Sequence, residues 1–350
     1  MANFFGKNRT KSQGGISDSG RSRRLGFLAL VAVLGLLATV ANRVYRYFTP
    51  PVVYGLPEPA RRITAVDVSY LDYRARVGPE VEPPACLQAM VGALDLASAS
   101  GLRAWATKLT GVGPVYLPGT DTIFVPVGRN ATPLVDLAHE RAHGVQDQFV
   151  NLDSLLSART TTDSRLAAKA ILEGVAVLAS DTLAGHEEAV YTDDILSNWD
   201  KATYVQGAAF VRDQRDRSGR SLVEITSAPP ISTWSLLFPG EELPATLRQP
   251  SAPELDGDAV LTCDGDELGP LALYTAALRY TNSYQVAARV AFAWRGDRVT
   301  IYELHGQTYA RWAVNFAPGA VNIAARWSEW YPAVPEAIDD GLTTPDTAAQ

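Results

Sequence analysis

Residues 137–143 read Leu-Ala-His-Glu-Arg-Ala-His, an HExxH motif within a stretch of apolar periodicity. On a helix, His139 and His143 lie one turn apart on one face, so both imidazoles can reach the same metal ion. Glu140 then sits beside the water on that ion, where a carboxylate can take up a proton. The motif therefore predicts two metal ligands and a general base.

The residues around the motif favour a helix. Thr132 suits the N-cap and Pro133 the first helical position. An apolar stripe follows at helical spacing, made up of Leu134, Leu137, Ala138, Val145 and Phe149. The alternative is a helix whose two histidines make ordinary hydrogen bonds in a packed interior. Because the whole chain has only four histidines, two of them at ligand spacing around a glutamate favour the metal site.

A third ligand must come from another segment, because one straight helix cannot surround a tetrahedral ion. Residues 161–184 read as a long helix, and Glu173 lies on its otherwise apolar face. A carboxylate in that place needs a partner, which Zn²⁺ would supply. The alternative is an ion pair with an arginine or lysine. Asp147 continues the histidine face of the first helix but is badly placed to bind the ion.

Several motifs carry a resemblance to a known family. Residues 139–148 are similar to the signature HExxHALQDQ, and residues 173–176 to the segment EGxA. Residues 204–211 resemble YxxGxxFV, residues 228–239 resemble PPxST followed by LHP, and residues 293–298 resemble GWxGDR. These are motifs of a bacterial and archaeal family of gluzincin-like metallopeptidases, and they cover just over half of the chain.

Three positions depart from the family pattern, namely Phe238, Pro270 and Val175. None of them is a proposed metal ligand. The resemblance implies an α+β, zincin-like metallopeptidase domain in which Zn²⁺ is held by a Glu from one helix and two His from another. It also implies that Glu140 acts as the general base in hydrolysis of a peptide or protein substrate.

An oxyanion that develops during such a hydrolysis needs a hydrogen-bond donor beside the metal. Tyr204 is the first candidate for this catalytic role and His305 the second, followed by Arg298 and Tyr302. Residues 113–126 predict a β-hairpin that leads into the HExxH helix. In zincin-type peptidases the strand before that helix borders the cleft and can pair with an extended peptide. A hairpin with no role beyond the core is the alternative.

The amino terminus predicts a membrane anchor. Residues 1–24 carry six basic side chains and one acidic, and an uncharged apolar run of 17 residues extends from Leu25 to Ala41. Arg43 and Arg46 follow the run, which favours an uncleaved signal anchor over a cleaved signal peptide. The basic excess before the run predicts a single-pass protein of the cell membrane, with its catalytic domain outside the cytoplasm.

Composition bounds the remaining possibilities. The 350 residues are 47% hydrophobic, enough to bury a large core. The net charge is −7, and about −12 without the basic tail, which argues against nucleic acid as a partner. Cys86 and Cys263 could form a disulfide or stay as two unrelated thiols. The expected divisions are a disordered tail (1–24), the anchor (25–42), a Pro-rich linker (43–80), the zincin-like domain (81–334) and a disordered tail (335–350).

A second hypothesis retains the zincin fold without catalysis. In that case the domain would bind peptides or cell-envelope partners, and loss of Glu140 would change no measurable function. A third, purely structural protein would hold no metal at all. The sequence predicts neither the substrate nor the oligomeric state.

Overall fold

A computed structural model describes most of the chain between residues 53 and 320. The described residues are 31–34, 36–37, 40, 53–77, 85–94, 96–97, 100–102, 113–127, 134–180, 192, 194–255 and 257–320. The chain divides into two compact units, Met1–Pro50 and Pro51–Gln350. The expected tails at 1–24 and 335–350, and the helix start at Thr132 and Pro133, lie outside the described residues.

The predicted transmembrane helix is wrong. Crossing a bilayer takes about 20 consecutive apolar residues in a helix. Among the described residues, no helix is both long enough and apolar enough for that. Of the expected anchor at 25–42, the structure describes 31–34, 36–37 and 40, all helical. The predictions of a membrane partner and of a single-pass membrane localisation depended on this helix and are therefore wrong as well.

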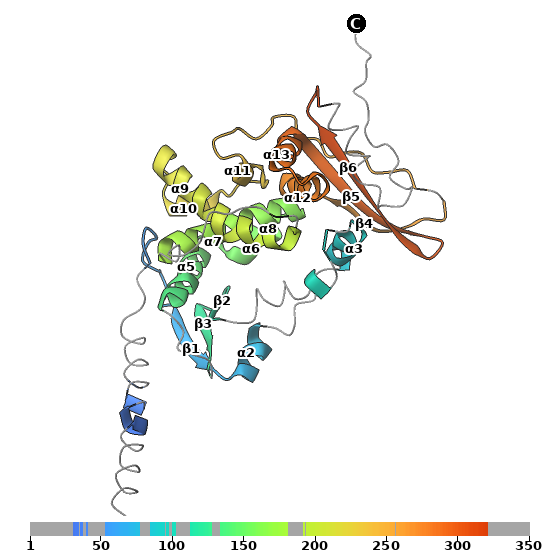
Figure 1. The fold of residues 1–350 in the computed structure, drawn as a ribbon. Coiled ribbons are helices and arrows are strands. Elements are labelled where there is room, and N and C mark those ends of the chain that lie inside the picture. Colours follow the sequence, from blue (N-terminus) through green and yellow to red (C-terminus); the bar gives the residue numbers. More distant parts are fainter. Residues whose placement is uncertain are drawn as a thin grey trace, which may run out of the picture. The chain divides into compact units, whose positions relative to one another are not determined.

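The larger unit is a mixture of helix and sheet (Figure 1). Its first sheet has the strand order β1-β3-β2. Strand β1 (Thr64–Val68) pairs in parallel with β3 (Thr122–Pro126), and β2 (Val115–Leu117) pairs with β3 in the antiparallel sense. The hairpin expected at 113–126 is therefore confirmed. The segment assigned to the linker at 43–80 contributes β1 and the following helix α2 (Tyr70–Val77).

The HExxH stretch is helical, as predicted. Helix α5 (Leu134–Val150) lies against the first sheet on one side and against α7 (Thr162–Ser180) on the other, with the short α6 (Leu152–Ser157) between them in sequence. Leu137 and Val145 pack into a small core with Tyr116 and Ile123 of the sheet and with Ile63, which directly precedes β1. Gly144 leaves room for this packing, because a Cβ there would lie 2.7 Å from the terminal methyl of Ile63 and that side chain would have to shift.

Helix α7 is crossed by a second helical segment at very close range. Helix α8 (Ile195–Lys201) runs into the π-helical turn η1 (Ala202–Gln206) and then α9 (Gly207–Ser218). A Cβ on Gly174 would collide with the backbone of Gly207, and one on Gly207 would collide with the carbonyl oxygen of Ala170. The two glycines therefore let η1 approach the part of α7 that carries Glu173.

The second sheet has the order β4-β5-β6 and is antiparallel throughout. Its strands are β4 (Val260–Asp266), β5 (Trp294–Leu304) and β6 (Gln307–Phe316), and the helices α3 (Ala85–Ala93) and α12 (Gly269–Thr281) contact it. Cys263 on β4 is disulfide-bonded, and the only other cysteine in the chain is Cys86. The short helices α10 (Leu222–Ser227) and α11 (Trp234–Leu237), together with α13 (Tyr284–Ala293), complete the unit.

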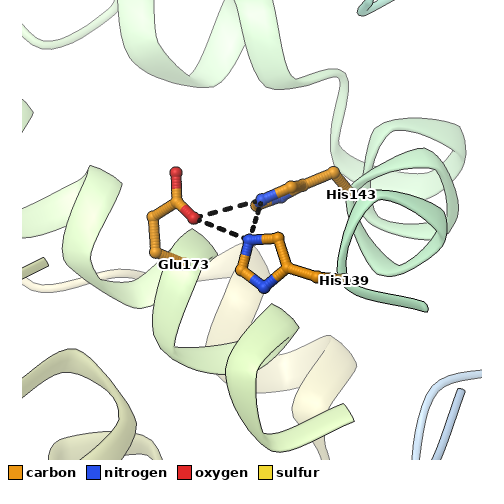
Figure 2. A group of neighbouring side chains, drawn as sticks. All are labelled: His139, His143 and Glu173. Carbon is orange, nitrogen blue, oxygen red and sulfur yellow. Dashed lines mark hydrogen bonds and ion pairs between the residues drawn. The ribbon is translucent and has the colours of Figure 1, made fainter. Parts of the chain in front are cut away.

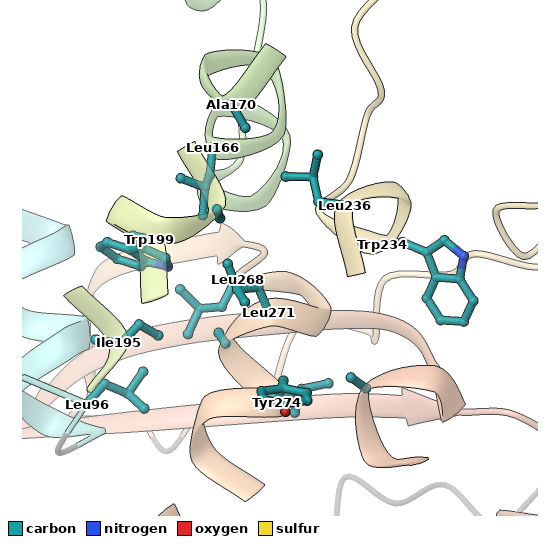
Figure 3. Close-up of a cluster of buried hydrophobic side chains, with 14 of the residues drawn as sticks. Leu96, Leu166, Ala170, Ile195, Trp199, Trp234, Leu236, Leu268, Leu271 and Tyr274 are labelled. Atoms are coloured by element: carbon teal, nitrogen blue, oxygen red, sulfur yellow. The ribbon is translucent and has the colours of Figure 1, made fainter. Parts of the chain in front are cut away.

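One large hydrophobic core joins these parts. Leu166 and Ala170 of α7 belong to the same buried cluster as Trp199 of α8 and Leu271 of α12 (Figure 3). Burial of this much apolar surface is the main force that fixes α7 in place. The helix that carries Glu173 is thus anchored in the main core, whereas α5 bridges this core and the small one beside the first sheet.

Two buried carboxylates hold the starts of α11 and α12 against α7 and β5. Asp163 accepts hydrogen bonds from the backbone N–H and the hydroxyl of Thr233, at 3.0 and 2.5 Å. Asp297 accepts from the backbone N–H groups of Leu268 and Gly269 and from two indole N–H groups. These bonds satisfy backbone donors at a helix start that would otherwise be buried without partners. The segments that resemble PPxST and GWxGDR therefore supply parts of a structural network.

Candidate metal centre

Three side chains on two helices converge on one point (Figure 2). His139 and His143 come from α5 and Glu173 from α7. The His139 Nε2 atom lies 3.0 Å from Glu173 Oε2, His143 Nε2 lies 3.2 Å from the same oxygen, and the two nitrogens are 3.1 Å apart. This group could hold a metal ion.

The spacing of the three ligand atoms suits a small cation. Around a tetrahedral ion with bonds of about 2.0–2.1 Å, neighbouring ligand atoms lie about 3.4 Å apart, so an expansion of a few tenths of an ångström admits the ion. The side chains are only 12–14% exposed. Because the lone pairs of all three atoms face one another in a nearly dry place, a proton or a cation must lie between them.

The electrostatics of the three groups are strongly coupled. Burial alone would lower the pKa of His143, but the charge of Glu173 outweighs it and raises that pKa to about 9. Burial alone would raise the pKa of Glu173, but the positive charge of His143 and hydrogen bonds from both histidines hold it well below its usual range. The carboxylate is therefore charged and ready to act as a ligand.

A fourth residue, Gln146, fixes the orientation of His143. Its side-chain oxygen lies 2.8 Å from His143 Nδ1, and its amide nitrogen donates to the carbonyl oxygen of Leu172 at 2.9 Å. Since the amide nitrogen is used for Leu172, the oxygen must accept from His143, which puts the ring proton on Nδ1 and leaves Nε2 for the metal. The sequence analysis did not identify Gln146 as a site residue. Its position, three residues after His143 on the same helix, could have indicated a polar contact with that histidine.

Glu140, the expected base, is held next to this centre. Its Oε2 atom accepts the backbone N–H of Tyr116 at 2.7 Å, which ties it to β2, an edge strand of the first sheet. Burial raises the pKa of Glu140, partly offset by the two histidines and by this hydrogen bond. A raised pKa brings a carboxyl group closer to the range in which it can both accept and return a proton near neutral pH.

The structure places Tyr204, the first candidate for an oxyanion donor, near the three-ligand group. Its ring centroid lies 6.4 Å from that of His139. It belongs to η1, and π-helical turns are frequent at functional sites because they redirect a side chain. Burial, together with the charges of Glu173 and Glu140, raises the pKa of Tyr204, so the hydroxyl keeps its proton and stays a donor. No described residue forms a hydrogen bond with this hydroxyl.

The other expected donors lie elsewhere. His305 is in the exposed turn between β5 and β6, where it adopts a positive φ of 52° ahead of Gly306. Arg298 donates to Asp264 on β4, and Tyr302 stacks on Tyr309 with ring centroids 5.5 Å apart. The structure does not bring His305, Arg298 or Tyr302 to the three-ligand group.

Asp147 and Gln148 attach the hairpin to α5. Asp147 accepts from the hydroxyl of Tyr116 at 2.9 Å and from the backbone N–H of Gly119 at 2.7 Å. Gln148 exchanges hydrogen bonds with the backbone of Arg61 and donates to Asp121. Neither residue contacts a histidine ligand in these hydrogen bonds. Their position keeps β2 against Glu140.

No family model, no curated protein and no solved structure matches this chain.

Proposed function

We propose that this protein is a zinc-dependent peptidase. The observation that carries the proposal is the convergence of His139, His143 and Glu173 beside the half-buried Glu140. Two histidines with one carboxylate form a set that leaves a coordination position open on zinc, as catalytic sites require. When bound, zinc supplies a Lewis acid that polarises a carbonyl group and increases the acidity of water.

The protein's own groups have distinct parts in the proposed reaction. Glu140 takes the proton of the attacking water and passes it to the leaving amine. Its Oε2 atom is held by the Tyr116 N–H, which leaves the other carboxylate oxygen to accept that proton. The Tyr204 hydroxyl donates a hydrogen bond to the oxyanion that develops on the scissile carbonyl. On the edge strand β2, the N–H of Tyr116 is already used by Glu140, which leaves the carbonyl group of this residue to pair with an extended peptide.

The experiment begins with metal content. We expect about one zinc per chain in the purified protein and clear loss of zinc in Glu173→Ala, measured by mass spectrometry of the metal. Zinc retained by Glu173→Ala would place the third ligand elsewhere. A well-folded parent without zinc would contradict the proposal.

Hydrolysis is tested on a mixture of peptides of varied sequence. We expect Glu140→Gln to keep zinc and to lose cleavage, because an amide cannot take up the proton. Glu303→Gln, at an exposed position on β5, is the matched control and should cleave like the parent. A parent that holds zinc but cleaves nothing, with Glu140→Gln unchanged in every assay, would favour a peptide-binding module without catalysis.

A further inference from the structure

Gln146 is the residue of the HExxH helix whose position the proposed reaction does not explain. Its side chain is completely buried, with 0% exposure. Burying an amide in an apolar interior costs free energy unless its donors and acceptors find partners. Both ends of this amide do find one, and the two partners lie on different helices.

One partner of Gln146 is a proposed metal ligand, and the other directly precedes one in the chain. The oxygen accepts from Nδ1 of His143, a ligand on α5. The amide nitrogen donates to the carbonyl of Leu172, the residue that precedes Glu173 on α7. The neutral amide of Gln146 thus contacts the His143 ring with its oxygen and the backbone beside Glu173 with its nitrogen.

We infer that Gln146 is a positioning residue that sets the ring orientation of His143 and its distance from Glu173, and so determines how tightly the site binds its metal. The inference rests on the metal site of the proposed function. Groups that bind the second nitrogen of a ligand histidine fix its tautomer and its ring plane, and their loss typically weakens metal binding about 10- to 100-fold.

The test compares Gln146→Met with Gln148→Met in the full-length chain. Both remove a glutamine amide from α5 and replace it with an unbranched side chain of similar length. Gln148 makes its hydrogen bonds to Arg61 and Asp121, so its loss affects the hairpin and no ligand. The Zn²⁺ dissociation constant is measured by competition with a chromophoric chelator, together with thermal unfolding of the metal-free proteins.

We expect Gln146→Met to raise the Zn²⁺ dissociation constant about 10- to 100-fold and Gln148→Met to leave it unchanged. The visible absorption of the Co²⁺-loaded protein should shift in Gln146→Met alone, because it reports the geometry of the ligands. If Gln146 contributes only to stability, Gln146→Met will lower the unfolding temperature but leave the Zn²⁺ dissociation constant and the Co²⁺ absorption unchanged, which would also overturn the inference. Equal dissociation constants for Gln146→Met and the parent would overturn the inference.

Gln146→Glu provides a rescue experiment. A carboxylate can still accept the N–H of His143, although it cannot donate to Leu172. We therefore expect its Zn²⁺ dissociation constant to lie closer to that of the parent than that of Gln146→Met. Binding as weak as in Gln146→Met would overturn a role through His143. If the parent binds zinc but cleaves no peptide, the proposed function is contradicted and the inference on Gln146 still holds. If the parent binds no zinc, both are contradicted.

Discussion

Single residues of the stretch from His139 to Gln148 have different partners, and their partners define their roles. His139 and His143 face Glu173, and Glu140 faces an edge strand. Gln146 bridges α5 and α7, whereas Asp147 binds the hairpin. A stretch with so many polar residues can form a packed helix only because each buried polar group finds a partner.

Tyr204→Phe tests the donor of the proposed reaction. Removal of the hydroxyl leaves the ligands intact, so zinc content should be unchanged. The loss of one oxyanion donor typically lowers kcat by about 100- to 1,000-fold, and we expect a reduction of that order with a small change in KM. Steady-state kinetics on the best peptide of the mixture provide the measurement.

The matched control is Tyr309→Phe on β6, where the hydroxyl donates to Gln307 on the surface. This variant should keep the kcat of the parent. If Tyr204→Phe is as active as the parent, the hydroxyl has no part in catalysis, and the oxyanion must be stabilised by the metal or by backbone groups.

At the scale of elements, the sequence correctly predicted the helices and the hairpin that depend on local sequence patterns. Apolar periodicity gave the helices of the HExxH and Glu173 stretches, and the turn residues gave the hairpin before them. The sequence did not predict that β1 pairs in parallel with β3, because this pairing joins segments about 60 residues apart and has no local signal. It also assigned His305 to the site, whereas the tight turn of a hairpin holds that residue at the surface.

Gly207→Ala tests the crossing of η1 and α7. A Cβ at this position would collide with the carbonyl oxygen of Ala170, so the helices must separate. Overpacking of this kind costs about 1–3 kcal/mol of the free energy of unfolding. We also expect weaker zinc binding, because the shift displaces α7 near Glu173. Chemical denaturation and a chelator competition provide the two measurements.

Gly92→Ala is the comparison for Gly207→Ala, because Gly92 lies on the exposed side of α3 and no atom of the described residues is within 4 Å of its potential Cβ. Alanine is the better helix former, so this variant should be unchanged or more stable by up to about 1 kcal/mol. Equal stability of Gly207→Ala and the parent would mean that the two helices do not need their close contact.

At the scale of the whole molecule, buried acidic groups as well as apolar packing hold the second sheet and the helices together: Asp297 on β5 binds the start of α12, and Asp163 on α7 binds Thr233 at the start of α11. Burial raises the pKa of Asp297 to about 6, and the hydrogen bonds from its four donors oppose this rise. Glu267, beside Asp266 and Asp297, is half-buried, and burial together with these charges raises its pKa to about 7. The sequence could not predict such a cluster, because Asp163 and Asp297 are distant in the chain and come together only in the folded protein, where the Asp163 N–H donates to the carbonyl oxygen of Glu267 and Asp297 accepts from the N–H of Gly269.

The raised pKa of Glu267 predicts a pH dependence of stability. Its pKa is about 7 in the folded protein and near the ordinary glutamate value of 4.5 in the unfolded chain, so the folded state binds more protons between these values. The stabilising contribution is complete below about pH 4.5 and is lost as the pH rises through about 7. We therefore expect the metal-free parent to unfold at a lower temperature at pH 8 than at pH 5, and Glu267→Gln to reduce this difference. Glu303→Gln, exposed on β5, should behave like the parent. If Glu267→Gln shows the full pH dependence of the parent, Glu267 is not its source, and Asp163, whose pKa burial raises to about 7, becomes the group to replace by asparagine.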